Sequence, residues 1–97
     1  MICITAIIKA KRGHEAAVQA ALVASGAAGA AHESGTLGYH VGRDPANPTV
    51  FTTYERFVDR AAMDAHNATT GKRFFDAVGD LLDGPVSFAV TEEIWVK

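Results

Sequence analysis

The sequence predicts an α+β protein with the ferredoxin-like order βαββαβ, in which the helices cover one face of a four-stranded antiparallel sheet. Four segments rich in β-branched and aromatic residues alternate with two regions of helical periodicity. The second and third strand segments are joined by a short turn, Asp44-Pro45-Ala46-Asn47-Pro48, which predicts an antiparallel hairpin. Right-handed crossovers then place both helical regions on the same face of the sheet.

The first half of the chain supplies a strand, a long helix and a second strand. Residues 2–10 are rich in isoleucine and predict the first strand. Residues 14–33 are crowded with alanine, the residue of highest helix propensity, and carry apolar side chains at helical spacing. Gly35 predicts the end of this helix, and residues 37–43 predict the second strand.

The second half supplies the third strand, a helical region and the last strand. Residues 49–57 alternate in character and predict the third strand. Two helical pieces follow at 59–68 and 70–82, with a break between them where Thr70 is expected to cap the second piece. A Gly-Pro pair stops that piece, and residues 86–96 predict the last strand.

Composition limits the classes of function. A chain of 97 residues forms one domain, which we expect to span residues 1–97. The net charge of −2 offers no basic surface for nucleic acid, and no apolar run approaches the ~20 residues that span a bilayer. The N-terminus has no basic leader and Cys3 is the only cysteine, so we expect a cytoplasmic protein without disulfides.

The strands also predict how the chain associates. Large apolar residues occupy both alternation sets of three strands: Ile4 and Ile7, Tyr54 and Phe57, Phe88 and Trp95. A sheet that is apolar on both faces has to cover the face that the helices leave open. We therefore expect a homodimer in which two sheets meet face to face about a two-fold axis.

His66 is the leading candidate for chemistry. It lies on the helix after the third strand, and Ala62 and Met63 lie one turn before it on the same surface. Such a histidine either bonds to a main-chain carbonyl at the edge of the core or acts as a base in a pocket. The second role is open to it because the ordinary pKa of imidazole, ~6.5, leaves the ring partly neutral near physiological pH.

Glu55 is the second candidate. It shares the alternation set of Phe51 and Phe57, so we expect it to be partly buried. Buried carboxylates are rare without partners. Glu55 therefore either pairs with a structural donor or orients His66.

Four other residues are candidates for the wall of a substrate pocket. Phe74 and Phe75 belong to the buried face of the last helical piece, and His40 lies beside Gly42, which leaves room for a ligand. Tyr54 either contributes to the same wall or packs in the core or an interface. No spacing of His, Asp, Glu or Cys matches a metal site, and no phosphate loop is present, so neither a metal nor a cofactor is expected.

Short motifs are spread over nearly the whole chain: Gly13, Glu33-Ser34-Gly35-Thr36-Leu37-Gly38-Tyr39, Asp44-Pro45, Pro48, Phe51, Tyr54-Glu55, Phe57, Asp59, Ala62, His66, Phe74 and Leu81-Leu82-Gly84-Pro85. In these motifs the chain resembles the antibiotic biosynthesis monooxygenase superfamily. The members of that superfamily are small dimeric α+β barrel proteins. The resemblance implies a pocket between sheet and helices, faced by the residue at His66.

The superfamily includes cofactor-free oxygenases of quinols and polycyclic phenols, haem-degrading enzymes and an isomerase of a phosphorylated signalling sugar. Quinol-oxidising relatives often carry a second histidine five residues after the position of His66, where this chain has Gly71. Haem-degrading relatives usually have tryptophan at the position of His66 and an axial histidine later in the helix. Residues 72–82 contain no histidine, so haem is not expected.

These points predict a cofactor-independent monooxygenase that oxidises a small phenolic or quinol substrate with O₂. A deprotonated phenol can reduce O₂ itself, so the protein has to bind the ring, remove a proton and exclude water. His66 would accept the proton, Glu55 would orient His66 or act as a structural anion, and Tyr54, Phe74 and Phe75 would form walls. A phenol of pKa ~10 and an imidazole of ~6.5 leave ~5 kcal/mol for the pocket to supply.

Two alternatives stay open at this point. One is an isomerase or lyase acting on a small carbonyl compound, in which His66 moves a proton without oxygen. A phosphorylated substrate would need a basic pocket, and only Lys72 and Arg73 are near enough to suggest one. The other is a non-catalytic dimeric domain that binds a small molecule.

Overall fold

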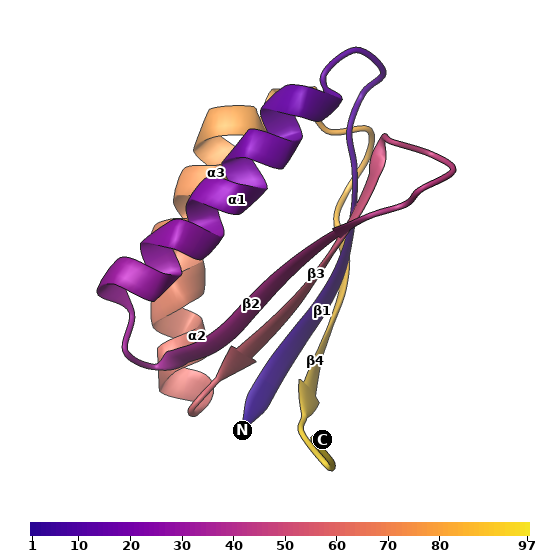
Figure 1. Cartoon of the computed structure of the whole chain (residues 1–97). Helices are drawn as coiled ribbons and strands as arrows, with labels where there is room; N and C mark the ends of the chain where they lie inside the picture. The colour runs from indigo at the N-terminus through magenta and orange to yellow at the C-terminus, as the bar shows by residue number, and fades with distance from the viewer.

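The computed structural model describes residues 1–97 and confirms the βαββαβ order (Figure 1). The strands are β1 (Ile2–Lys9), β2 (Thr36–Arg43), β3 (Val50–Phe57) and β4 (Ser87–Glu92). The helical segments are α1 (Glu15–His32), α2 (Arg60–His66), the π-helical turn η1 (Asn67–Gly71), α3 (Lys72–Val78) and the 3₁₀ turn η2 (Gly79–Leu81). The helices lie on one side of the sheet, as predicted (Figure 1).

The four strands form one antiparallel sheet in the order β2-β3-β1-β4. Glu55 of β3 pairs with Ile4 of β1 on one side and with Tyr39 of β2 on the other. Directly paired residues point to the same face of a sheet. Glu55 and Tyr39 therefore share the helix-covered face with the buried Ile4.

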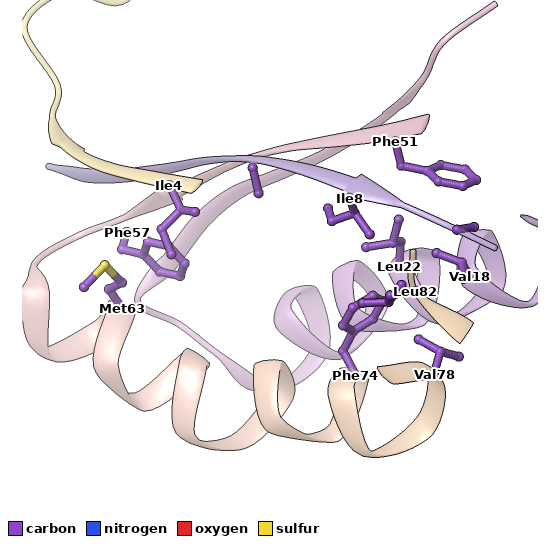
Figure 2. Packing of buried hydrophobic residues seen from close by; sticks show 12 residues of the cluster. Ile4, Ile8, Val18, Leu22, Phe51, Phe57, Met63, Phe74, Val78 and Leu82 are labelled. Atoms are coloured by element: carbon purple, nitrogen blue, oxygen red, sulfur yellow. The ribbon is translucent and has the colours of Figure 1, made fainter. Parts of the chain in front are cut away.

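Twelve buried apolar residues form one core between the sheet and the helices (Figure 2). Phe51 and Phe57 of β3 are its largest fully buried side chains. Burying each phenylalanine contributes about 1.5–3 kcal/mol. Because strand side chains alternate, the same geometry that buries these two rings also buries Glu55, which lies between them on β3.

The turn after α1 packs closely against α2. A Cβ added at Gly35 would lie 2.6 Å from the Cβ of Ala62, so the turn approaches α2 at a distance that only glycine allows. The main-chain N–H of Val58 also donates to the Gly35 carbonyl at 2.8 Å. This contact brings Glu33, the residue that follows α1, beside the last turn of α2.

The expected break near Thr70 is wrong, because the chain stays helical from Arg60 to Val78. The main-chain N–H of Lys72 bonds to the carbonyl of Asn67, five residues back, which defines a π-helical turn. Thr70 is buried inside this turn and caps nothing. Its hydroxyl has another partner, described below.

The last strand is shorter than predicted. It ends at Glu92, and residues 93–97 form no regular structure and expose 97% of Ile94 and 77% of Trp95. The guanidinium of Arg56 holds the start of this segment through contacts of 2.6 and 3.0 Å to the Glu93 carboxylate. None of the helices combines the length and apolar character that crossing a membrane requires.

Candidate functional site

The site begins with the short helix that carries His66. Asp59 caps α2, because its side chain accepts a hydrogen bond of 2.8 Å from the main-chain N–H of Ala62. His66 is the last residue of α2 and turns inward, with 4% of its surface exposed. Its ring lies 5.1 Å from that of Phe57, centroid to centroid. The imidazole is therefore a buried group on the helix-facing side of the sheet.

Two carboxylates contact the two ring nitrogens of His66. Nδ1 lies 2.7 Å from Oε1 of Glu33, and Nε2 lies 3.2 Å from Oε1 of Glu55. The exposed fraction of the Glu33 side chain is 17%, and that of Glu55 is 10%. The arrangement is a carboxylate–imidazole–carboxylate row that joins the end of α1, the end of α2 and the middle of β3.

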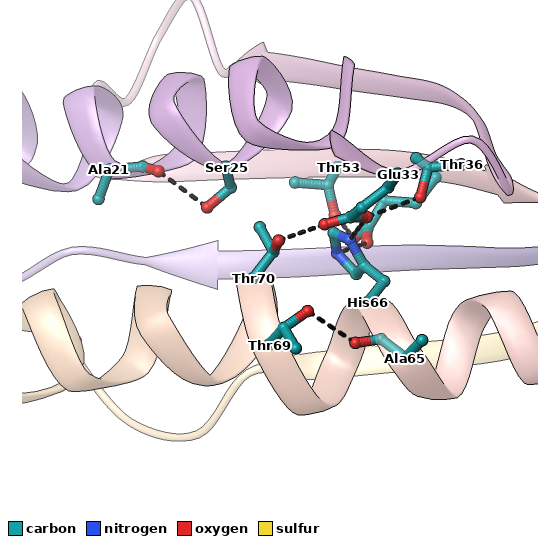
Figure 3. A network of polar contacts seen from close by, with 10 residues as sticks. Ala21, Ser25, Glu33, Thr36, Thr53, Ala65, His66, Thr69 and Thr70 are labelled. Carbon is teal, nitrogen blue, oxygen red and sulfur yellow. Dashed lines mark hydrogen bonds and ion pairs between the residues drawn. The ribbon is translucent and has the colours of Figure 1, made fainter. Parts of the chain in front are cut away.

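Three hydroxyls hold the two carboxylates in place (Figure 3). Thr36 donates to Oε1 of Glu33 at 2.8 Å, and Thr70 donates to Oε2 of the same residue. Thr53 donates to Oε2 of Glu55 at 2.8 Å. Because each carboxylate is fixed by partners other than the imidazole, the row is rigid on both sides of His66.

The charges of the row stabilise one another. Burial alone would lower the pKa of His66, but its hydrogen bonds to Glu55 and Glu33 outweigh burial and raise the pKa above 6.5. Burial alone would raise the pKa of Glu33, but hydrogen bonds from Thr70, His66 and Thr36 outweigh it, so this pKa is lowered. The charged imidazolium and the ionised Glu33 are therefore both favoured near neutral pH.

A cavity of about 260 Å³ opens beside this row. His66, Glu55, Tyr39 and Thr53 contribute to its polar wall, and Phe74 and Phe75 contribute to its apolar wall. The other lining residues are Ile4, Ala6, Ile8, Leu22, Ser25, Asn67, Gly71, Lys72, Val86 and Phe88. Phe75 is 50% exposed and Phe88 is 66% exposed, which places them at the mouth. The volume accommodates a small aromatic ring.

The structure brings four of the six predicted site residues to this cavity: His66, Glu55, Phe74 and Phe75. Tyr54 and His40 do not line it. They pair across β3 and β2 with their rings 6.3 Å apart, and strand alternation directs them to the opposite, open face of the sheet. The expectation that they share a pocket with His66 is therefore corrected.

On the open face, Tyr54 belongs to a different cluster. Its hydroxyl lies 3.5 Å from the sulfur of the buried Cys3, next to the Arg56–Glu93 ion pair. The hydrogen bond with Cys3 and the partial burial of the phenol raise the pKa of Tyr54. This cluster belongs to the sheet face that the helices leave uncovered.

The sequence reasoning missed Glu33 and Tyr39. Glu33 follows the last turn of α1, where a carboxylate is disfavoured by the negative end of the helix dipole, so an acidic residue there signals a specific partner. Tyr39 lines the cavity, and a Cβ at Gly26 would lie 2.9 Å from its ring, so Gly26 leaves space for that ring. Burial and the negative charge of Glu55 raise the pKa of Tyr39, which keeps its hydroxyl protonated.

Comparison with known proteins places the chain in a family. A family model described as antibiotic biosynthesis monooxygenase matches residues 1–77. The chain belongs to the antibiotic biosynthesis monooxygenase family. No protein with a curated description matches this family member by sequence.

Solved structures of other proteins share the fold of this antibiotic biosynthesis monooxygenase family member. A Nitrosomonas europaea protein superimposes with a TM-score of 0.89 at 19% identity, over 98% of this chain and 100% of its own. One from Deinococcus radiodurans gives 0.86 at 25% identity, over 100% and 96%. Both are named as candidate members of the family. A Pseudomonas aeruginosa protein gives 0.83 at 27% identity, over 97% and 94%.

The polar row of this family member does not form a metal site. No group of three His, Cys, Asp or Glu side chains is arranged to hold a metal ion. Both ring nitrogens of His66 already have carboxylate partners, and no buried side-chain nitrogen or oxygen lacks a partner. What the arrangement offers is proton transfer at the edge of an apolar cavity.

Replacing Glu33 with glutamine is expected to lower the pKa of His66, because the amide keeps the shape of the side chain and removes its negative charge. The loss of a hydrogen bond between charged groups should also lower the free energy of unfolding by about 1.5–3 kcal/mol at pH 6. NMR titration of the four histidine rings measures the pKa, and the His66→Gln variant identifies the signal. Glu15→Gln removes a carboxylate from the start of α1, where it accepts a hydrogen bond from the Gly13 N–H, and should leave the His66 titration unchanged. An unaltered titration in Glu33→Gln would show that Glu33 does not set the charge of His66.

Proposed function

We propose that the chain is a cofactor-independent monooxygenase that oxidises a small phenol or hydroquinone with O₂, using His66 as the proton acceptor. The observation that carries the proposal is the position of His66. Its ring is buried in the wall of the cavity, and the carboxylate of Glu33 contacts Nδ1, the ring nitrogen that does not contact Glu55. Membership of the antibiotic biosynthesis monooxygenase family supports the reaction class. The cavity volume supports a ligand built on a small aromatic ring.

Glu33 takes the orienting role that the sequence analysis gave to Glu55. Its contact with Nδ1 is the shorter of the two, and two threonine hydroxyls fix its carboxylate. When His66 is neutral, Nδ1 keeps its proton and donates it in the hydrogen bond to Glu33. The lone pair of Nε2 is then free to accept a proton. A carboxylate that holds one imidazole nitrogen so that the other can accept a proton is the arrangement of the Ser-His-Asp triad.

Glu55 occupies the direction from which a substrate would reach Nε2. Its Oε1 lies 3.2 Å from Nε2, so the hydroxyl of a bound phenol would share or replace this contact. The carboxylate can accept the hydroxyl hydrogen bond in the ground state and align it with the imidazole. In this scheme Glu55 orients the substrate and Glu33 orients the base.

The atoms and electrons of this reaction balance without an added redox centre. The phenol loses its proton to His66, and the phenolate transfers electrons to O₂. One oxygen atom forms a bond to a ring carbon. The other leaves as water with two hydrogens from the substrate, the proton that His66 gives back and the hydrogen displaced from the ring. A phenol and O₂ thus become a quinone and water, and all the electrons that reduce O₂ come from the substrate.

The proposal is tested by oxygen uptake with a panel of small phenols and hydroquinones. We expect uptake of one O₂ per molecule oxidised, with one atom of ¹⁸O₂ appearing in the quinone. An isomerase or lyase would convert its substrate without oxygen, and a binding domain would hold the ring without turnover. Ligands that bind in the cavity and leave the oxygen concentration constant would overturn the monooxygenase assignment.

The alternative of a phosphorylated substrate has less support from the cavity. Lys72 is the only cationic side chain among the lining residues apart from His66, and 69% of its surface is exposed. Its ammonium lies 2.7 Å from the carboxylate of Asp76 and is therefore already paired. A phosphate would find no buried cation other than the imidazolium, whose two partners are both carboxylates.

We also propose that two copies associate through the open sheet face. Ile7 on that face is 44% exposed and Tyr54 is 38% exposed, and the C-terminal segment exposes Ile94 and Trp95. A stable pair usually buries about 1,200–2,000 Å² in total. Sedimentation equilibrium should give a dimer of the 10.2 kDa chain, and Ile7→Lys should shift it toward monomer. Arg43→Ala, near the distal end of β2, is a matched surface control; a monomer at ~100 µM wild-type protein would contradict the proposal.

A further inference from the structure

The polar end of the cavity carries more negative than positive charge. His66 and Glu55 line this end, and Glu33 lies behind His66 with its carboxylate 2.7 Å from Nδ1. The two carboxylates carry two negative charges, and His66 between them contributes at most one positive charge. Even with the imidazole protonated, the row keeps one net negative charge. Its three members are largely removed from solvent, so water screens this charge only partly.

No other side chain at this end offsets that charge. Tyr39 and Thr53, which share the polar wall, are neutral donors. Lys72 lies at the rim of the cavity in an ion pair with Asp76. Arg56 lies on the opposite face of the sheet, where Glu93 neutralises it. The rest of the wall is mostly apolar, and its polar side chains, Ser25 and Asn67, carry no charge. The Ser25 hydroxyl already donates to the Ala21 carbonyl.

We propose that Glu33 and Glu55 make this cavity selective for uncharged and cationic phenols, and that they exclude phenols carrying a carboxylate or phosphate on the same ring. The inference rests on the proposed function only in taking a phenol as the ligand. It adds the charge of the substrate class and names the two residues that set it. The cavity is small enough in volume that a ring substituent cannot lie far from the row.

The expected size of the discrimination follows from Coulomb's law. A ligand anion ~7 Å from one net negative charge, at an effective dielectric constant of ~20, should bind about 50-fold more weakly than its neutral counterpart. A cationic counterpart should bind at least as well as the neutral one. Aromatic side chains around the mouth, such as Phe75 and Phe88, favour a cation further.

The test compares three ligands that differ only in one substituent: 3-hydroxybenzyl alcohol, 3-hydroxybenzylamine and 3-hydroxybenzoate. Binding is measured by calorimetry at pH 6, where His66 is protonated, and at constant ionic strength. We expect the alcohol and the amine to bind and the benzoate to bind about 50-fold more weakly. Three equal affinities, no binding by any of the three, or a preference for the benzoate would overturn the inference.

Glu55→Gln provides the matched variant, because it removes one charge from the row and keeps the shape of the side chain. We expect it to bring the benzoate to within a few-fold of the alcohol, whereas Asp64→Asn, on the exposed side of α2, should leave the difference intact. A variant that folds, as judged by its thermal transition, and keeps the full discrimination contradicts the assignment to Glu55. Glu33→Gln also removes one negative charge from the row, so the affinity of this variant for the benzoate provides a second test.

Failure of this inference is distinguishable from failure of the proposed function. If the alcohol binds and the benzoate does not, while no ligand consumes oxygen, charge selection stands and oxygenation fails. If the benzoate and the alcohol are oxidised equally well, oxygenation stands and charge selection fails.

Discussion

Replacing His66 with glutamine is expected to lower kcat/KM for an oxidisable phenol by about 10²- to 10⁴-fold. Glutamine can still contact Glu33 and Glu55, but it cannot accept a proton, and general-base catalysis contributes rate factors of this size. The loss should fall on kcat more than on KM, because the rest of the cavity wall is unchanged. Oxygen uptake at saturating and limiting substrate separates the two parameters.

The wild-type enzyme should show the matching pH dependence. Because the two carboxylates raise the pKa of His66, the imidazole becomes neutral only above its ordinary value of 6.5. We therefore expect kcat/KM to increase with pH through an apparent pKa above 6.5 and the His66→Gln variant to lack this step. His32→Gln, at the exposed end of α1, is the matched control. Activity of His66→Gln within about threefold of the wild type would exclude His66 as the proton acceptor.

Replacing His66 with alanine should lower the free energy of unfolding by about 3–5 kcal/mol at pH 6. The substitution leaves two carboxylates facing an emptied, poorly hydrated space with no positive charge between them, and an unpaired buried charge carries a cost of this size. Chemical denaturation measures the change. His32→Ala should cost far less, because His32 is exposed. An equal cost for the two variants would contradict a buried ion-pair role.

The pH dependence of this cost has a definite sign. The folded pKa of His66 is raised, so its stabilisation is complete below about 6.5 and is lost as the pH rises through the folded value. The folded pKa of Glu33 is lowered, so its stabilisation is complete above about 4.5 and is lost as the pH falls through the folded value. The difference between wild type and His66→Ala should therefore be largest between pH 4.5 and 6.5.

The fold followed from local patterns because each pattern had one dominant cause. Alternation along β3 placed Glu55 on the same face as Phe51 and Phe57, and the structure buries all three. Helical spacing after Asp59 likewise placed His66 with Met63 on the inner surface of α2. The residues of the site that a single element can position were thus visible in the sequence.

Site residues whose position depends on the packing of two elements could not be predicted from the sequence. Glu33 reaches His66 only because Gly35 lets the turn after α1 approach α2. No pattern in the sequence predicts this approach of the turn to α2. His40 was misplaced because Gly42 beside it suggested room for a ligand, whereas its pairing with Tyr54 sets the face to which it points. Tyr54 was misplaced although alternation along β3 already puts it on the face opposite Glu55. The π-helical turn was missed because Thr70 suggested an N-cap, whereas Thr70 is buried within a continuous helix and bonds to Glu33.

The most direct test of the central claim is a crystal structure of the chain with a hydroquinone bound in the absence of oxygen. We predict that the ring lies in the cavity between sheet and helices, with one hydroxyl oxygen within about 2.6–3.2 Å of Nε2 of His66. A ring bound on the open face beside Tyr54 and His40, or a hydroxyl turned toward the mouth of the cavity, would contradict it.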